Sequence, residues 1–185
     1  FNIPWGITSD GTNLYVVDYG NHLIRKIVIS SGVVTTVAGT GSSGSADGTG
    51  TAASFNQPAG ITTDGTNLYV ADESNNTIRK IVITSGVVTT LAGTAGSSGS
   101  TNATGASARF NGPSGITTDG TNLYVTDQSM IRKIVISTGA VTTLAGASGQ
   151  TASTDGTGTA ARFHTPSGIT TDGTNLYVAD KSGHT

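Results

Sequence analysis

The chain repeats itself about every 54 residues, and this period constrains its fold more than any other feature. Each repeat opens on a phenylalanine that is soon followed by a proline and a Gly-Ile-Thr segment: Phe1, Phe55, Phe110 and Phe163. The phenylalanines are separated by 54, 55 and 53 residues. Such a period is typical of repeat architectures, in which each unit buries its apolar face against its neighbours. The sequence therefore predicts a single domain with three full repeats and part of a fourth: 1–54, 55–109, 110–162 and 163–185.

Each repeat has the pattern of two β-hairpins. In the second repeat, Asp64-Gly65 separates two runs rich in β-branched residues, and Ser85-Gly86 separates two more. Glycine adopts a positive φ at little cost, so Asp-Gly between such runs indicates a hairpin turn. Four antiparallel strands in about 54 residues predict one blade of a β-propeller. A β-solenoid is the main alternative, but its coils are shorter and lack two hairpins per repeat.

Composition narrows the functional classes. Only 11% of the residues are charged, and the net charge is −2 with no cluster of lysine and arginine. A nucleic-acid surface needs a basic stripe, so we expect no nucleic-acid partner. The chain has no run of about 20 apolar residues, which predicts no membrane span, and it has no cysteine for a disulfide or thiolate site. Abundant Thr, Ser, Asn and Gly fit a secreted bacterial protein, so we expect an extracellular or cell-surface location.

The segment FNIPWGITSDGTNLYVVDYGNHLIRKI, residues 1–27, resembles the NHL repeat, whose name stands here as Asn21-His22-Leu23. The joints GTGTAASFNQPAGI and ATGASARFNGPSGI are similar to those of NHL propellers in large bacterial surface proteins and teneurins. The resemblance covers the whole chain and implies an all-β propeller of four-stranded antiparallel blades. Propellers of this family bind proteins, RNA or small ligands, a few are lyases, and most have six blades. The resemblance therefore predicts the fold and leaves the function open.

The end of the chain falls inside a blade. Aligning the segment from Asp180 with that from Asp18 places Thr185 where Leu23 stands, so an Ile-Arg-Lys strand should come next. Three and a half blades would leave blade faces uncovered and strand edges unpaired. We therefore expect a partial ring that further blades or other copies of the chain complete.

Most charged residues recur at the same position of successive repeats. An aspartate that ends the second strand should pair with an arginine that begins the third, and this role is structural: Asp18–Arg25, Asp72–Arg79 and Asp127–Arg132. A second aspartate should cap the first hairpin turn: Asp10, Asp64, Asp119 and Asp172. Only Glu73 and Lys181 have no counterpart of like charge. A catalytic centre on a propeller needs different residues from different blades at the axis, so the repeated charges predict no enzyme.

Trp5 is the most informative departure from the repeat. Its counterparts Ala59, Ser114 and Ser167 are all small, and the position lies at the entry to the first strand, near the axial mouth. A single tryptophan there either anchors a ligand or fills a gap at the seam of the ring.

Other candidate ligands are weaker. His22 and His164 are candidate binding residues on different blades, and they would form a metal site only if they met at the axis. Asp47 and Asp155 lie in long Gly-rich loops and are weak calcium candidates, because each loop offers one carboxylate and calcium needs six or more oxygens. We expect no cofactor.

We therefore favour an extracellular, non-catalytic module that binds a protein or another ligand through loops on a rigid scaffold. Two alternatives remain open: a subunit of a surface assembly or fibre, and a metal-dependent enzyme of the lyase or lactonase type. Metal analysis of the purified protein distinguishes the enzyme, and negative-stain microscopy distinguishes the assembly.

Overall fold

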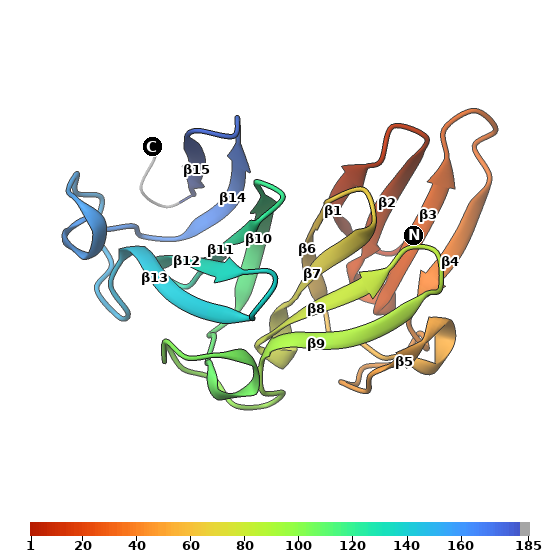
Figure 1. The fold of residues 1–185 in the computed structure, drawn as a ribbon, viewed down its shortest axis with the longest axis horizontal. Helices are drawn as coiled ribbons and strands as arrows, with labels where there is room; N and C mark the ends of the chain where they lie inside the picture. The colour runs from red at the N-terminus through yellow and green to blue at the C-terminus, as the bar shows by residue number, and fades with distance from the viewer. Residues whose placement is uncertain (182–185) are drawn as a thin grey trace.

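The computed structural model describes residues 1–181 as a series of antiparallel sheets that follow one another in an arc (Figure 1). The first blade contains β1 (Pro4–Ser9), β2 (Asn13–Asp18), β3 (Leu23–Val28) and β4 (Val34–Ala38). The second contains β6 (Pro58–Thr63), β7 (Asn67–Asp72), β8 (Thr77–Val82) and β9 (Val87–Gly93). The third contains β10 (Pro113–Thr118), β11 (Asn122–Asp127), β12 (Met130–Val135) and β13 (Ala140–Gly146).

The fourth repeat contributes a hairpin of β14 (Pro166–Thr171) and β15 (Leu176–Asp180). Within each blade, the four strands of the complete blades and the two of the half-blade pair in sequence order, so the blades have up-and-down topology. The prediction of an all-β fold with four-stranded antiparallel blades, three of them complete and half of a fourth, is confirmed. Residues 182–185, on which the expectation about the end of the chain depends, lie outside the described residues.

The long Gly-rich joints belong to the blade that follows them. In the first joint, β5 (Gly48–Thr49) pairs with the outer strand β9 and makes the second sheet five-stranded. Counting repeats placed this segment at the end of blade one, whereas its backbone pairs with blade two. The outer edge of β9 carries unpaired N–H and C=O groups, and the joint satisfies some of them. An isolated bridge from Thr104 to Ala140 repeats the arrangement in blade three.

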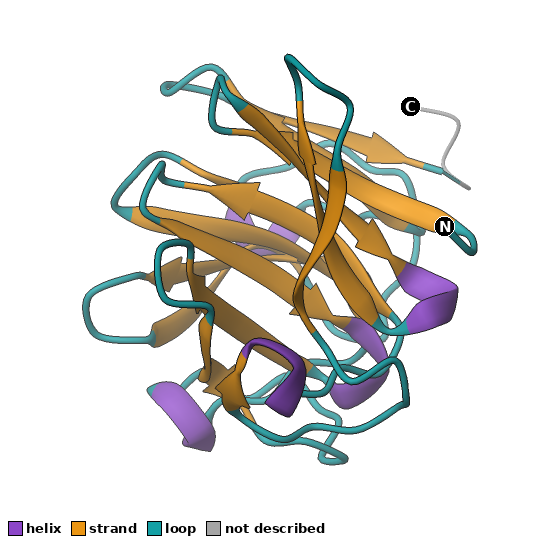
Figure 2. Cartoon of the chain, turned by 90° about the vertical axis from the view of Figure 1, so that its right-hand side faces the viewer, coloured by secondary structure: helices purple, strands orange, loops and turns teal. Residues whose placement is uncertain are grey.

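The core lies between blades. Figure 2 shows the sheets packed face to face in successive layers. Tyr15 and Val17 of blade one pack in one cluster with Leu68 and Val70 of blade two, and all four side chains are buried. The opposite face of blade two packs against blade three in a second cluster. Strands that are apolar on both faces are needed because a central blade has a neighbour on each side.

The first strands of the blades approach one another closely, and a glycine in each makes this possible. A Cβ atom on Gly6 would lie 2.6 Å from the carbonyl oxygen of Ala59, and a Cβ on Gly60 would overlap the carbonyl oxygen of Ser114. A larger residue would push the inner strands apart. The repeated Gly-Ile pair therefore sets how tightly the blades curve around their axis.

The helical segments are single 3₁₀ turns: η1 (Tyr19–Asn21), η2 (Gly50–Ala52), η3 (Glu73–Asn75), η4 (Gly105–Ser107) and η5 (Gly158–Ala160). In the part of the chain that the structure describes, no helix has the length and apolar character needed to cross a membrane.

Candidate ligand-binding site

The repeated ion pairs lie inside the blades, away from any site. Arg79 Nη1 lies 2.9 Å from Asp72 Oδ2, and Arg132 Nη1 lies 2.7 Å from Asp127 Oδ2, with all four side chains fully buried. In blade one the equivalent contact of Arg25 with Asp18 is 3.2 Å, and the Arg25 side chain is 22% exposed. The expected pairs are therefore present, although paired residues lie diagonally across the two strands.

Each buried arginine also binds the joint that precedes its blade. Arg79 Nη2 lies 2.8 Å from Asp47 Oδ1, and the same carboxylate accepts hydrogen bonds from the N–H and hydroxyl of Thr90. Asn102 has the same role in blade three, where its Oδ1 accepts from Arg132 Nη2 at 2.9 Å. Asp47 was a calcium candidate on sequence grounds, but in the structure its carboxylate is bound by protein donors. The sequence contained one sign of this role. Asn102 stands at the repeat position of Asp47, and both side chains offer an oxygen that accepts a hydrogen bond from the arginine.

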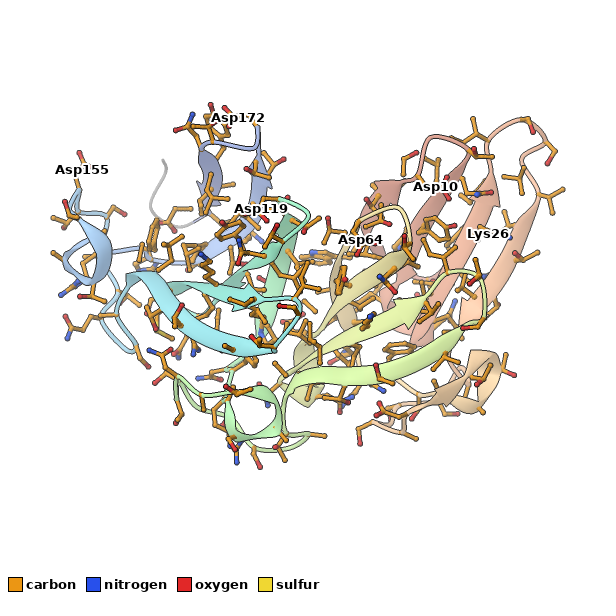
Figure 3. All side chains as sticks on the ribbon, viewed as in Figure 1. Asp10, Lys26, Asp64, Asp119, Asp155 and Asp172 are labelled. Atoms are coloured by element: carbon orange, nitrogen blue, oxygen red, sulfur yellow. The ribbon has the colours of Figure 1, made fainter. Side chains whose placement is uncertain are left out.

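The turn aspartates act as expected from the sequence. Asp10 Oδ1 accepts from the N–H groups of Thr12 and Asn13, and Oδ2 accepts from the Asn13 amide and the Tyr15 hydroxyl. The Asn13 side-chain bond first, and the other bonds with it, hold the pKa of Asp10 well below its usual range against the opposing effect of burial. Figure 3 places Asp64, Asp119 and Asp172 at the tips of the corresponding hairpins. These carboxylates are fully engaged and serve the turns.

The first strands of four repeats surround one cavity of about 410 Å³ at the axis. Its wall repeats a Gly-Ile pair from each of β1, β6, β10 and β14. The residue before the glycine varies between repeats, and here the wall includes Trp5, Ser114 and Ser167. Trp5 is 59% exposed, and its ring lies 5.7 Å from that of Tyr19 at an angle of 32°. The structure thus places Trp5 where the sequence predicted, at the axial mouth.

A second variable position lies at the same mouth. The residue that follows the last aspartate of each second strand is different in every repeat: Tyr19, Glu73, Gln128 and Lys181. Burial raises the pKa of Tyr19, and the charge of Glu73 on the next blade raises it further. Lys181 lines the axial cavity. We define Trp5, Tyr19, Glu73 and Lys181 as the axial mouth.

The axial mouth offers several kinds of group to a ligand. It offers an aromatic pair, one carboxylate, one ammonium group and the hydroxyls of Ser114 and Ser167. Within residues 1–181, no three His, Cys, Asp or Glu side chains gather as a set of metal ligands. Sequence reasoning noted that Glu73 and Lys181 do not repeat but missed Tyr19, because its position relative to the axis depends on the 3₁₀ turn that it begins.

The two candidate histidines lie elsewhere. His22 Nδ1 accepts a hydrogen bond from the N–H of Gln57 at 3.0 Å, which joins blade one to the entry of blade two. In the next blade, Asn76 Oδ1 accepts from the N–H of Gly112 at 2.9 Å in the same way. His164 is exposed, and its Nδ1 lies 3.2 Å from the hydroxyl of Thr165. Neither lines the axial cavity.

Comparison with known proteins agrees with this architecture. Residues 1–27 match the NHL repeat. The whole chain aligns with human NHL repeat-containing protein 2 at 30% identity over 221 residues, which is 30% of that protein's length. The chain belongs to the NHL-repeat β-propeller family. This chain spans less than a third of the length of the human protein.

Solved structures show the same fold. A Bacteroides thetaiotaomicron protein of unknown function matches 98% of this NHL chain and 45% of its own, with 25% identity and a TM-score of 0.82. An auxiliary nutrient binding protein from the same species matches 97% of this chain and 46% of its own, with 17% identity and a TM-score of 0.73. Virginiamycin B lyase from Staphylococcus aureus is also similar, with 97% and 49% of the chains covered, 18% identity and a TM-score of 0.59. At these identities the last two matches establish the fold alone.

Proposed function

We propose that this chain is a non-catalytic recognition module of an extracellular protein and that it binds its ligand at the axial mouth. One observation carries the proposal. The charged residues inside the blades repeat from blade to blade, whereas the axial mouth has a tryptophan in one repeat only and a different residue in each repeat at the position of Tyr19. This arrangement suits a binding protein. A ligand without the symmetry of the ring needs different contact groups from different blades, and the repeated residues hold those groups in place.

The chemistry of the mouth favours a ligand with a flat or apolar face and a polar group. The exposed ring of Trp5, packed beside Tyr19, offers a large rigid contact surface. Lys181 and Glu73 can bind groups of opposite charge at its rim. A Bacteroides thetaiotaomicron protein with this fold is named as an auxiliary nutrient binding protein, so the fold is compatible with a binding function.

Tryptophan fluorescence tests the proposal, because Trp5 is the only tryptophan in the chain. We expect its emission to change on titration with a ligand selected from panels of oligosaccharides and short peptides. The control variant is Trp5→Ser, which carries the residue found at the same position in blades three and four. Calorimetry should show at least tenfold weaker binding by this variant, with an unchanged melting temperature. Equal binding by both proteins would place recognition elsewhere.

A second candidate function is a role in a larger assembly. Phe1 and Ile7 of blade one are 57% and 59% exposed, whereas Phe55 and Ile61 at the same repeat positions are 0% and 5% exposed. This face has the composition of a blade interface, so further blades or other copies of the chain would cover it and complete the ring. Light scattering of the purified chain tests for copies.

The lyase or lactonase alternative rests on fold similarity to the Staphylococcus aureus enzyme alone. Metal analysis of the purified protein, with and without a chelator wash, distinguishes this class from a binding module. A stoichiometric metal would favour the enzyme over the function proposed above.

A further inference from the structure

Blade three has a buried polar side chain at a position that is apolar in the other repeats. Thr126 directly precedes the aspartate that ends β11, and its side chain is fully buried. The residues at the same repeat position are Val17, Ala71 and Ala179. A buried hydroxyl lowers stability unless it is hydrogen-bonded, so the contacts of Thr126 indicate what this exchange achieves.

The hydroxyl of Thr126 has three partners. Its oxygen accepts a hydrogen bond from the backbone N–H of Gly115 at 2.7 Å. It also lies 2.9 Å from the hydroxyl oxygen of Ser114 and 3.2 Å from the carbonyl oxygen of Ser167 on the next blade. These contacts join the first and second strands of blade three to the first strand of the half-blade.

The three contacts determine the direction in which each proton points. A hydroxyl donates one hydrogen bond and accepts two. A carbonyl only accepts, so the Thr126 proton is donated to Ser167, and the N–H of Gly115 takes one lone pair of Thr126. The second lone pair then accepts the proton of Ser114. The reverse direction would leave a buried lone pair and the Ser167 carbonyl without these partners, which is unfavourable.

Ser114 is therefore a hydrogen-bond acceptor toward the axial cavity. It lines this cavity, whereas Thr126 does not. Ser167, which also lines the cavity, donates its own proton to the carbonyl of Ala179 at 3.4 Å. Both serines thus donate into the protein and present lone pairs to a ligand. A ligand group that donates a hydrogen bond suits this wall, and a group that only accepts does not.

The remaining groups of the axial mouth favour a neutral ligand with a flat apolar face. Trp5 is 59% exposed and lies beside Tyr19, so its ring is available to a ligand. The mouth also contains one carboxylate, Glu73, and one ammonium group, Lys181. A cation is repelled by the lysine and an anion by the glutamate, whereas a neutral polar ligand can bind both groups.

The size of the axial cavity suits a single ring. Its volume of about 410 Å³ lies in the range of about 300–1,000 Å³ that small-molecule sites occupy. The first strands of four repeats surround it, whereas an extended peptide needs a groove or a strand edge along its length. A pyranose ring is compact and neutral, has an apolar face of C–H groups, and carries hydroxyls that donate and accept.

We propose that the axial mouth binds the ring of a neutral pyranose sugar. The C–H face of the sugar lies against Trp5, and one sugar hydroxyl donates a hydrogen bond to Ser114. Thr126 is a positioning residue, which directs the lone pairs of Ser114 into the cavity. This inference rests on the function proposed above, namely recognition at the axial mouth, and adds the class of ligand.

The test uses the methyl pyranosides of glucose, galactose, mannose and N-acetylglucosamine at millimolar concentration, with the emission of Trp5 as the signal. We expect saturable binding of at least one. Each hydroxyl of the tightest pyranoside is then replaced by hydrogen and, separately, by fluorine, which is polar but cannot donate. At the hydroxyl that meets Ser114, both replacements should weaken binding about fivefold, the effect of one neutral hydrogen bond. The fluoro sugar should bind no more tightly than the deoxy sugar.

Two variants that retain Trp5 locate this hydrogen bond. Ser114→Ala carries the residue of blade two, Ala59, and should bind the parent pyranoside about fivefold more weakly. It should no longer distinguish the parent from the two analogues. Thr126→Val carries the residue of blade one, Val17, and frees the proton of Ser114. In this variant the fluoro sugar should bind more tightly than the deoxy sugar, because Ser114 can then donate to fluorine. Ser114→Ala alone decides the case if Thr126→Val does not fold.

Several results would overturn the proposal. An absence of saturable binding by all four pyranosides would refute the sugar. Full discrimination by Ser114→Ala between the parent and its analogues would refute the acceptor. An equal loss of affinity for parent, deoxy and fluoro sugars in Thr126→Val would refute the positioning role, because a purely structural defect acts on all three alike.

Failure of this inference and failure of the proposed function are distinguishable. A short peptide or tetramethylammonium is titrated in parallel by calorimetry with the unchanged protein and with Trp5→Ser. If one of these binds in a Trp5-dependent manner and no pyranoside does, the sugar is refuted and recognition at the axial mouth stands. Pyranoside binding that Trp5→Ser leaves unchanged would refute both.

Discussion

Arg79 is completely buried, and its charge is balanced by ligands from three parts of the chain. Asp72 comes from the preceding strand of the same blade, Asp47 comes from the joint before that blade, and Phe55 stacks on the guanidinium. A buried cation is tolerated only with such a complete set of acceptors, and removal of one partner leaves an uncompensated charge. The arginine, which lies in the third strand, therefore connects the second strand, the joint and the segment that leads into the first strand of the blade.

Asp72→Ala should lower the free energy of unfolding by about 3 kcal/mol, because it leaves Arg79 buried without its main partner. Asp18→Ala is the matched control in blade one, where Arg25 is partly exposed, and it should cost about 1 kcal/mol. Urea unfolding of both variants measures the difference. Equal costs in the two blades would show that burial of the arginine does not determine the strength of the pair.

His22 and Asn76 both have left-handed φ angles, near 57°, and both accept a backbone N–H from the next blade. We therefore expect His22→Asn to change the free energy of unfolding by less than about 0.5 kcal/mol, because asparagine adopts this conformation readily. His22→Ala should cost about 1 kcal/mol through loss of the hydrogen bond. If thermal melting shows the asparagine variant to be the weaker of the two, the shared role of this position is refuted.

The acidic limit of stability also depends on single residues. Hydrogen bonds from the backbone N–H of Asn175 first, and from Thr174 and the side chains of Asn175 and Tyr177, hold the pKa of Asp172 well below its usual range. A carboxyl whose pKa is lower in the folded state stabilises the fold above its unfolded pKa of about 4 and loses that effect as the pH falls toward the folded value. The pKa of Asp10 is lowered by equivalent hydrogen bonds, with that of the Asn13 side chain first. We therefore expect the melting temperature to fall below about pH 4, and the fall to be smaller in Asp10→Asn. An identical fall in that variant would place the acid sensitivity outside the turns.

At the scale of the elements, the first strand of each complete blade sets the distance between that blade and the next. Its glycine sets the distance to the next blade, because a side chain there would meet the neighbouring backbone in the complete blades. Its proline pairs opposite the aspartate that ends the second strand, as Pro58 does with Asp72. The short segment thus positions both the axial cavity and the ion-pair network.

Gly60→Ala should destabilise the chain by about 1–3 kcal/mol, because the new methyl group would overlap the carbonyl oxygen of Ser114 and force the inner strands apart. Gly168→Ala is the matched control at the same repeat position. Its methyl group would meet the Ala179 Cβ at 3.6 Å, an ordinary contact, so the cost should stay within about 0.5 kcal/mol. Chemical denaturation of the pair gives both values, and an equal cost would mean that the spacing of the blades is not limited by this contact.

At the scale of the whole molecule, the two ends of the arc differ from its middle. The faces between blades bury nearly all of their apolar side chains, whereas the first face of blade one leaves Phe1, Ile7 and Val34 exposed. Tyr177, on the last hairpin, is 56% exposed, whereas Tyr69 at the same repeat position is fully buried. The repeat thus places the same apolar residues on faces that are covered and on faces that are open.

Paired substitutions measure whether the open face is covered in solution. Ile61→Ala should cost about 2–5 kcal/mol, because the side chain is 5% exposed in the core between blades. Ile7→Ala, at the same repeat position with 59% exposure, should cost less than about 1 kcal/mol in the isolated chain. A cost for Ile7→Ala close to that for Ile61→Ala would show that another surface covers blade one under the conditions of the measurement.

Much of the fold is encoded locally. The turn signals Asp64-Gly65 and Ser85-Gly86 and the β-branched runs on either side of them predict four strands per repeat, and the structure has four strands in each complete repeat. The pairing of Asp72 with Arg79 also follows from the sequence, because a hairpin brings together residues that are close along the chain. Comparison of the repeats also identifies Trp5 as different from its counterparts, because the repeats can be aligned from the sequence alone.

Only the tertiary structure decided which distant residues meet. Asp47 lies 32 residues before Arg79. Nothing in the local pattern of a Gly-rich loop indicates that its carboxylate accepts a hydrogen bond from an arginine of the following blade. The nearness of Tyr19 to Trp5 and to the charge of Glu73, and the place of Lys181 in the axial cavity, likewise depend on how whole blades stack. Turn chemistry and strand periodicity act between near neighbours and are written in the sequence by itself. The curvature of the arc is set by close approach of backbones in different blades, and those distances exist only after the blades have packed.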